Sequence, residues 1–153
     1  YSKVPSFVNA EGYERRLGGR MGLFGRIMPP MSAAEGRRGG GQGVLVGSVH
    51  KIQAEKHADI KTLMEAPGVA GTVVGGDQSS ALCAALGLTH LDQRDTPTFP
   101  ATCSGLGNQH GDLLCSSLGT ESQALTLHPC LSLHQVNFTL SDHALLVASI
   151  PLS

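Results

Sequence analysis

The apolar residues of this 153-residue chain fall into short runs that are separated by glycine, proline and polar clusters. Continuous or alternating runs rich in Val, Leu and Ile predict β-strands, whereas apolar positions three and four residues apart predict helices. The pattern predicts strands within 20–28, 44–50, 69–75, 112–116, 124–128, 132–139 and 144–150, and helices over 54–66 and 81–86. Helices thus lie between strands in the middle of the chain, and strands alone fill its two ends.

Turn-forming residues divide the chain into an arm and one domain. Residues 1–19 lack a sustained period and are expected to form an irregular arm, which a single domain over 20–153 follows. The first two strands are expected to pair as a hairpin whose long loop carries the basic tip Arg37-Arg38. The final run, 144–150, is almost wholly apolar, which is typical of a central strand buried on both faces. The whole pattern favours the α/β class with a mixed sheet.

Composition and charge narrow the class of protein. The apolar fraction of 41%, the charged fraction of 15% and the net charge of −1 indicate a globular protein without the basic excess of a nucleic-acid coat. Residues 1–42 carry seven Lys and Arg against three Glu, whereas residues 43–153 carry four against nine Asp and Glu. A basic arm therefore precedes an acidic body. No apolar run of roughly eighteen residues and no secretory signal pattern occurs, so we expect an intracellular protein without a membrane partner.

The cysteines and the first residue add two expectations. The four cysteines are widely spaced and include no Cys-x-x-Cys pair, which indicates reduced, mostly buried thiols rather than a zinc or redox centre. The chain begins with Tyr1 rather than Met, which predicts that it is processed or belongs to a longer protein.

Carboxylates and imidazoles recur at the ends of the predicted strands. They are His50, Asp77, Asp112, Asp142 and His143. If these strands are neighbours, the side chains meet at one edge of the sheet, where carboxylates suit Mg²⁺ or Mn²⁺ and histidines can exchange protons with a phosphate ester. Structural roles stay open as well: Asp77 as a helix cap, His50 as a surface histidine and Asp142 as a turn residue. The pattern favours phosphoester hydrolysis.

Four short segments, in this order along the chain, resemble motifs of the endonuclease/exonuclease/phosphatase superfamily. Ser48-Val49-His50 resembles its Asn-Thr-His, Gly76-Asp77-Gln78-Ser79 resembles its Gly-Asp-x-Asn, and Ser141-Asp142-His143 resembles its terminal Ser-Asp-His. The segment 111–116 resembles the strand upstream of the last motif. The resemblance implies a four-layered α/β sandwich that hydrolyses phosphate esters, nucleic acids among them, with Mg²⁺ or Mn²⁺.

The resemblance also implies roles for the acids and for one histidine. His143 would be the catalytic histidine, and Asp112 would orient it through its second ring nitrogen. Asp77 would position or activate water and would help to hold the metal together with Asp142. These four residues would form one active site.

The remaining motif residues would bind the substrate. His50 would contact the phosphate, with Ser48 and Ser79 at positions where the family pattern has asparagine. Nothing before residue 20 fits the asparagine and the metal-binding glutamate of the family's first half. We therefore expect a partial sandwich that is either the C-terminal part of an enzyme or a catalytically degenerate scaffold in a larger, nucleic-acid-containing or other assembly. Another protein chain would then cover its exposed sheet faces.

Overall fold

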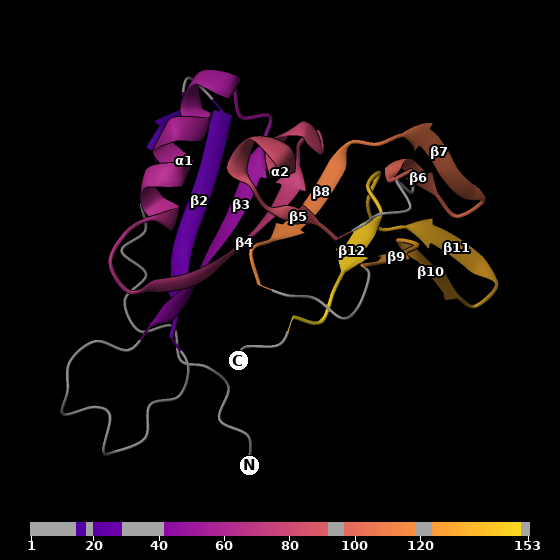
Figure 1. The fold of residues 1–153 in the computed structure, drawn as a ribbon. Coiled ribbons are helices and arrows are strands. Elements are labelled where there is room, and N and C mark those ends of the chain that lie inside the picture. The colour runs from indigo at the N-terminus through magenta and orange to yellow at the C-terminus, as the bar shows by residue number, and fades with distance from the viewer. Residues whose placement is uncertain (1–14, 18–19, 29–41, 92–96, 119–123, 151–153) are drawn as a thin grey trace, which may run out of the picture.

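Six strands form one mixed sheet, which is the largest element of the fold (Figure 1). The structure, a computed structural model, describes residues 15–17, 20–28, 42–91, 97–118 and 124–150. Neighbouring strands of the sheet are antiparallel except β3 and β4, which are parallel. The order across the sheet is β1 (Arg15–Leu17), β2 (Arg20–Ile27), β3 (Gly43–His50), β4 (Val69–Asp77), β8 (Asp112–Ser116) and β5 (Thr89–His90).

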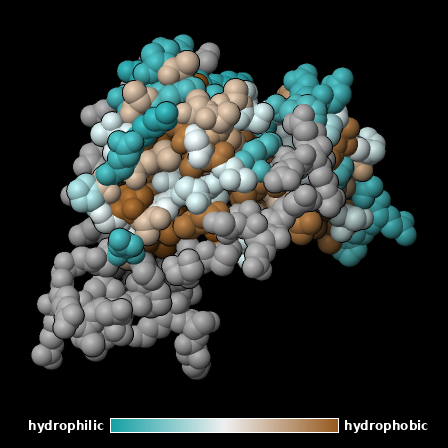
Figure 2. All heavy atoms as spheres, viewed as in Figure 1, coloured by the Kyte–Doolittle hydropathy of each residue, from teal (hydrophilic) through white to brown (hydrophobic). Residues whose placement is uncertain are grey.

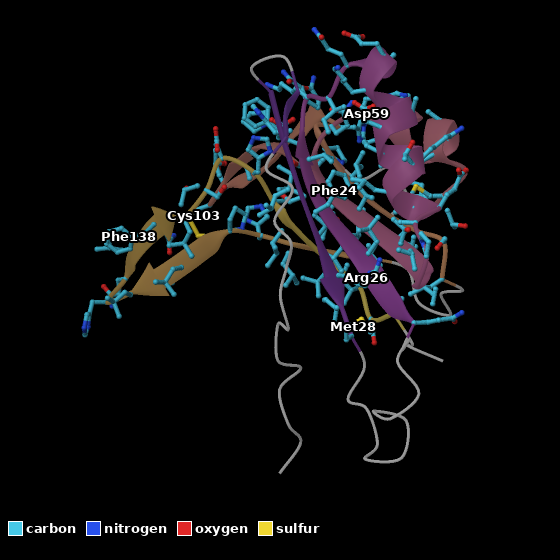
Figure 3. All side chains as sticks on the ribbon, turned by 90° about the vertical axis from the view of Figure 1, so that its left-hand side faces the viewer. Phe24, Arg26, Met28, Asp59, Cys103 and Phe138 are labelled. Atoms are coloured by element: carbon cyan, nitrogen blue, oxygen red, sulfur yellow. A yellow bond between two sulfur atoms is a disulfide. The ribbon has the colours of Figure 1, made fainter. Side chains whose placement is uncertain are left out.

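The helices lie together on one face of this sheet, as Figures 1 and 3 show. They are a 3-10 turn, η2 (Ala54–Lys56), which leads into α1 (His57–Met64), and the shorter α2 (Ala81–Leu86). Pro67 and Gly68 follow α1 on the way to β4, and the left-handed Gly87 (φ 71°) ends α2. Both predicted helices are confirmed, and so is the predicted pairing of β2 with β3.

The core lies between the sheet and the helices. Side chains alternate between the two faces of a strand, so Phe24, Leu45, Val49 and Val74 all point to the face that carries the helices. Ile60 of α1 and three residues of α2 close this core from above, namely Leu82, Cys83 and Leu86. The alternate positions of the same strands face away from the helices, and this second face carries the polar strand ends.

A close approach of two backbones fixes the pairing of β3 with β4. Gly76 lies opposite Val49 and has a φ of 142°, which residues with a side chain rarely adopt. A Cβ built on Gly76 would collide with the carbonyl oxygen of Val49. Only glycine therefore fits this strand end, where Asp77 follows directly.

Three two-stranded ribbons extend beyond the sheet (Figure 1). They pair β6 (Phe99–Thr102) with β7 (Gly105–Gln109), β9 (Leu125–Leu127) with β12 (Leu145–Val147), and β10 (Cys130–Leu133) with β11 (Val136–Thr139). A disulfide joins Cys103 to Cys130 and so links the first ribbon to the third. The prediction of reduced thiols is therefore wrong for this pair, whereas Cys83 and Cys115 are free and buried as predicted.

The predicted fold class, an α/β partial four-layered sandwich, is wrong. Strands dominate the described part of the chain, whose two α-helices are short, and the ribbons form no second large sheet. The left-handed residues His134 and Gln135 break the run 132–139, predicted as one strand, into a hairpin. The expected central strand over 144–150 is only the three-residue β12, paired with β9 alone. These apolar segments therefore supply ribbons instead of a second sheet layer.

Some predictions fall on residues outside the described ranges. They are the Arg37-Arg38 tip and most of the arm, of which β1 is the described part. Within the described ranges no helix combines the length and the apolar character that a membrane crossing requires.

Replacing Gly76 with alanine should lower the free energy of unfolding by about 2–4 kcal/mol, because the new Cβ meets the β3 backbone and the φ is strained. Thermal denaturation followed by circular dichroism measures the change. Gly105→Ala is the matched control, since a Cβ there meets nothing within 4 Å and should change stability by less than about 1 kcal/mol. Equal melting temperatures for the two variants would contradict the packing of β3 on β4.

Candidate active site

Three polar side chains form a row across one end of the sheet. His50 of β3 pairs in register with Asp77 of β4, and Asp77 pairs in register with Asp112 of β8. Residues paired in register point to the same face, which here is the face away from the helices. The side chains of Asp77 and Asp112 are 24% and 14% exposed. These two carboxylates are thus mostly buried, while the side chain of His50 is 59% exposed.

Two basic side chains meet the central carboxylate of the row. Nε2 of His50 lies 3.5 Å from Oδ2 of Asp77, and Nζ of Lys51 lies 3.6 Å from the same oxygen. The site residues predicted from the sequence motifs did not include Lys51. Its signal in the sequence is its position directly after a strand-end histidine.

The fourth residue, His143, reaches the row from the segment that precedes β12. The hydroxyl of Ser141 accepts the N–H of His143 at 3.1 Å, which shapes the turn. The N–H of Ala101 donates to the carbonyl of Asp142 at 2.7 Å, and the N–H of Ala144 donates to the carbonyl of Thr98 at 2.8 Å. The backbone of β6 and its neighbours therefore holds this segment beside the sheet.

The ring of His143 is fixed by Asp112. Its Nδ1 lies 2.9 and 3.0 Å from the two carboxylate oxygens of Asp112, so Nδ1–H donates and Nε2 remains for chemistry. The ring of Phe99 packs against the imidazole with ring centroids 4.8 Å apart. This carboxylate–histidine pair is the arrangement that the sequence motifs predict for these two positions.

Glycine leaves room between His143 and Asp77. A Cβ built on Gly111 would lie 3.9 Å from Oδ1 of Asp77 and 3.9 Å from Cε1 of His143. Oδ1 of Asp77 and Cε1 of His143 are therefore no more than twice 3.9 Å apart. The buried Thr98 holds Gly111 in place, because its hydroxyl accepts the N–H of Gly111 at 3.3 Å.

Sequence reasoning missed Thr98 and Phe99. Both belong to the segment between α2 and β8, in which the sequence motifs predicted no site residue. The signal that points to them is the run Thr-Pro-Thr-Phe-Pro over 96–100, in which a buried threonine and an aromatic residue interrupt a polar loop.

The surroundings of His143 favour its charged form. The hydrogen bond to Asp112 raises the pKa of the imidazole above its ordinary value of 6.5; burial opposes this, and the charges of Asp112, Asp77 and Asp142 add to the rise. A raised pKa means that the folded state binds this proton more tightly than the unfolded chain. The pair thus stabilises the fold fully below pH 6.5, and the stabilisation is lost as the pH rises through the folded-state pKa.

The other predicted site residues lie around the row in different ways. Ser48 is exposed on β3, opposite Gly75 and on the same face as His50. The hydroxyl of Ser79 accepts the N–H of Ala81 at 3.2 Å and so supports the first turn of α2. Asp142 is exposed, and its charge acts on His143. Asp77, for which a capping role was open, instead faces His50 and Lys51.

The acids of the row already have partners within the protein. Asp77 faces two basic groups, and Asp112 accepts from His143. Among the described residues no three His, Cys, Asp or Glu side chains are grouped so that they could hold a metal ion. The described residues therefore do not fit a three-ligand site, and the predicted role of Asp77 and Asp142 in binding Mg²⁺ or Mn²⁺ stays a prediction.

The chain has a distant structural likeness to solved structures. No family model matches the chain, and no curated protein matches it. Among solved structures, it is similar to the Bacteroides thetaiotaomicron VPI-5482 mannosyl-6-phosphatase Bt3783, with 15% sequence identity and a TM-score of 0.47. The match covers 84% of this chain and 57% of that structure, so this chain spans little more than half of the length of that protein.

In protein without divalent cations, an NMR titration should place the pKa of His143 above 6.5, and Asp112→Asn should lower it, because the amide removes the charge that holds the proton. Glu65→Gln is the control, since Glu65 is exposed after α1 and should leave the titration of His143 unchanged. A His143 pKa that does not respond to Asp112→Asn would contradict the pairing.

Proposed function

We propose that this chain is a phosphoester hydrolase domain whose active site is formed by Asp77, Asp112 and His143. The observation that carries the proposal is the pair of contacts from Nδ1 of His143 to Asp112, together with the approach of His143 and Asp77 to Gly111, where a built Cβ would lie 3.9 Å from an atom of each. A histidine that is oriented by one carboxylate can donate a proton to the ester oxygen, while a second carboxylate accepts a proton from the attacking water. This is what the hydrolysis of a phosphate ester by water requires.

The residues divide the reaction between them. Asp77 orients the attacking water and takes its proton as the new P–O bond forms. His143 donates its Nε2 proton to the ester oxygen as the old P–O bond breaks, and Asp112 stabilises the imidazolium before that transfer. His50, at the edge of the row, contacts a phosphoryl oxygen. Mg²⁺ or Mn²⁺ remains the proposed cofactor, while the chain's own residues carry both proton transfers.

The relation to the endonuclease/exonuclease/phosphatase superfamily remains a proposal too. It is supported by the motif segments at 48–50, 76–79 and 112–116, whose strands are neighbours in one sheet, and by the 141–143 segment that meets them. The structurally similar protein is a phosphatase by name, which agrees with phosphoester hydrolysis at a coarse level. The support for the proposal is the side-chain geometry of the motif residues. The substrate class stays a phosphate ester, with nucleic acid among the candidates.

A second candidate function is that of an interaction subunit, and the ribbons favour it. In the β10–β11 ribbon the pairs Leu131–Phe138 and Leu133–Val136 share one face, and these side chains are 47–54% exposed. Figure 3 shows Phe138 far out on this ribbon, and Figure 2 shows apolar side chains at the surface on the ribbon side. Residues 124–141 contain no Asp, Glu, Lys or Arg. A surface of this kind is typical of contact with another protein chain, which we propose as the partner.

Replacing His143 with alanine should lower the turnover of p-nitrophenyl phosphate or bis(p-nitrophenyl) phosphate by at least about 100-fold, because proton transfer in the transition state is lost. The assay is run with Mg²⁺, with Mn²⁺ and with a chelator, and circular dichroism checks that the variant folds.

The matched control is His134→Asn, at the tip of the β10–β11 ribbon, where the left-handed backbone (φ 49°) suits asparagine. It should keep the wild-type turnover. Wild-type turnover in the His143 variant would refute the proposed role of this residue.

Replacing Leu131 and Phe138 together with serine should reduce the fluorescence of the dye ANS, which binds exposed apolar surface, and should leave the melting temperature within a few degrees. Phosphoester turnover should stay unchanged, because both residues lie on the ribbon and not in the row. A large loss of stability would show that these side chains pack within the molecule, and would contradict the partner surface.

A further inference from the structure

The end of β3 turns in an unusual way. Consecutive residues of a strand point to opposite faces, so a residue that follows His50 in an extended conformation would face the helices. Lys51 instead has a φ of 48°, and its N–H donates to the carbonyl of Asp77 at 2.8 Å. The left-handed turn brings Lys51 to the oxygen of Asp77 that His50, paired in register with Asp77, also meets.

The ion pair with Asp77 does not by itself explain why a lysine occupies this position. The left-handed conformation is unfavourable for every residue with a side chain except Asn and Asp, and glycine adopts it without strain. The side chain of Lys51 is 56% exposed, and an exposed ion pair contributes about 0–1 kcal/mol, which is less than the roughly 1–2 kcal/mol that the left-handed conformation costs. A strained non-glycine residue beside a cluster of reactive groups is typical of a functional role.

The charges of the residues around Lys51 indicate which kind of ligand it could bind. Asp77, Asp112 and Asp142 act on His143 and make this end of the sheet acidic, which repels a phosphate anion. Lys51 supplies a permanent positive charge on a flexible stem at the open side of Asp77, and an ammonium group binds phosphate as a point charge.

We propose that Lys51 is a phosphate-binding residue of this site, which moves from Asp77 to a phosphoryl oxygen when an anion enters beside His143. The ligand class is a phosphoryl anion, either a phosphate ester or inorganic phosphate. The inference rests on the proposed function for the identity of the substrate, and its test uses binding instead of turnover.

Isothermal titration calorimetry with inorganic phosphate tests the proposal. Lys51→Gln should weaken phosphate binding about tenfold or more, and Lys51→Arg should stay within about threefold of the wild type, because it keeps the charge. Lys51→Gly should weaken binding as much as Lys51→Gln while raising the melting temperature, since glycine relieves the left-handed strain. A merely structural lysine would not separate affinity from stability in this way.

Lys56→Gln is the matched control, because Lys56 also forms an ion pair, with Asp59 at 4.0 Å, but lies on η2. It should leave phosphate affinity unchanged. Wild-type affinity in Lys51→Gln, or no phosphate binding by the wild type, would overturn the proposal. If the affinity falls as expected while the wild type hydrolyses neither nitrophenyl ester, the role of Lys51 stands and the proposed hydrolysis fails.

Discussion

The register between β3 and β4 is the constraint on which the rest of the structure depends. These two strands are the parallel pair of the six-stranded sheet, and their alignment places His50 beside Asp77. The absence of a side chain at Gly76 permits the close backbone contact that sets this alignment. A slip by one residue would turn Asp77 toward the apolar core, where an unpaired carboxylate is strongly unfavourable. The chemistry at the sheet edge and the packing beneath it are therefore set by the same contact.

The candidate site joins two parts of the chain that are held by different forces. Its acids stand on strands whose opposite faces are buried by α1 and α2, so the hydrophobic effect keeps them rigid. Its histidine stands on a segment that two backbone hydrogen bonds hold: the N–H of Ala101 donates to the carbonyl of Asp142, and the N–H of Ala144 donates to the carbonyl of Thr98. The contact between His143 and Asp112 closes the arrangement. The candidate site thus combines strands that core packing holds with a segment that hydrogen bonds hold.

Much of the local structure follows from the sequence, because it depends on neighbouring residues. The helix over 81–86 lies between Ser80 and Gly87, and β8 coincides with the predicted run 112–116. The row of His50, Asp77 and Asp112 was predictable in outline, since each residue ends or begins an apolar strand. The fold class was not predictable, because an apolar run of residues does not reveal how many other strands will pair with the strand that it forms. The contact of Lys51 with Asp77 was not predictable either, because the direction of this side chain depends on the φ angle of Lys51.

The disulfide between Cys103 and Cys130 makes the arrangement of the ribbons depend on the cellular compartment. Such bonds persist in the endoplasmic reticulum, the periplasm and the extracellular space, and glutathione reduces them in the cytosol. Opening the bond would release a covalent loop that contains β7, β8 and β9, and with them Asp112. The unfolded chain would gain entropy worth about 3.5 kcal/mol. The redox environment therefore helps to set how firmly the carboxylate that orients His143 is held.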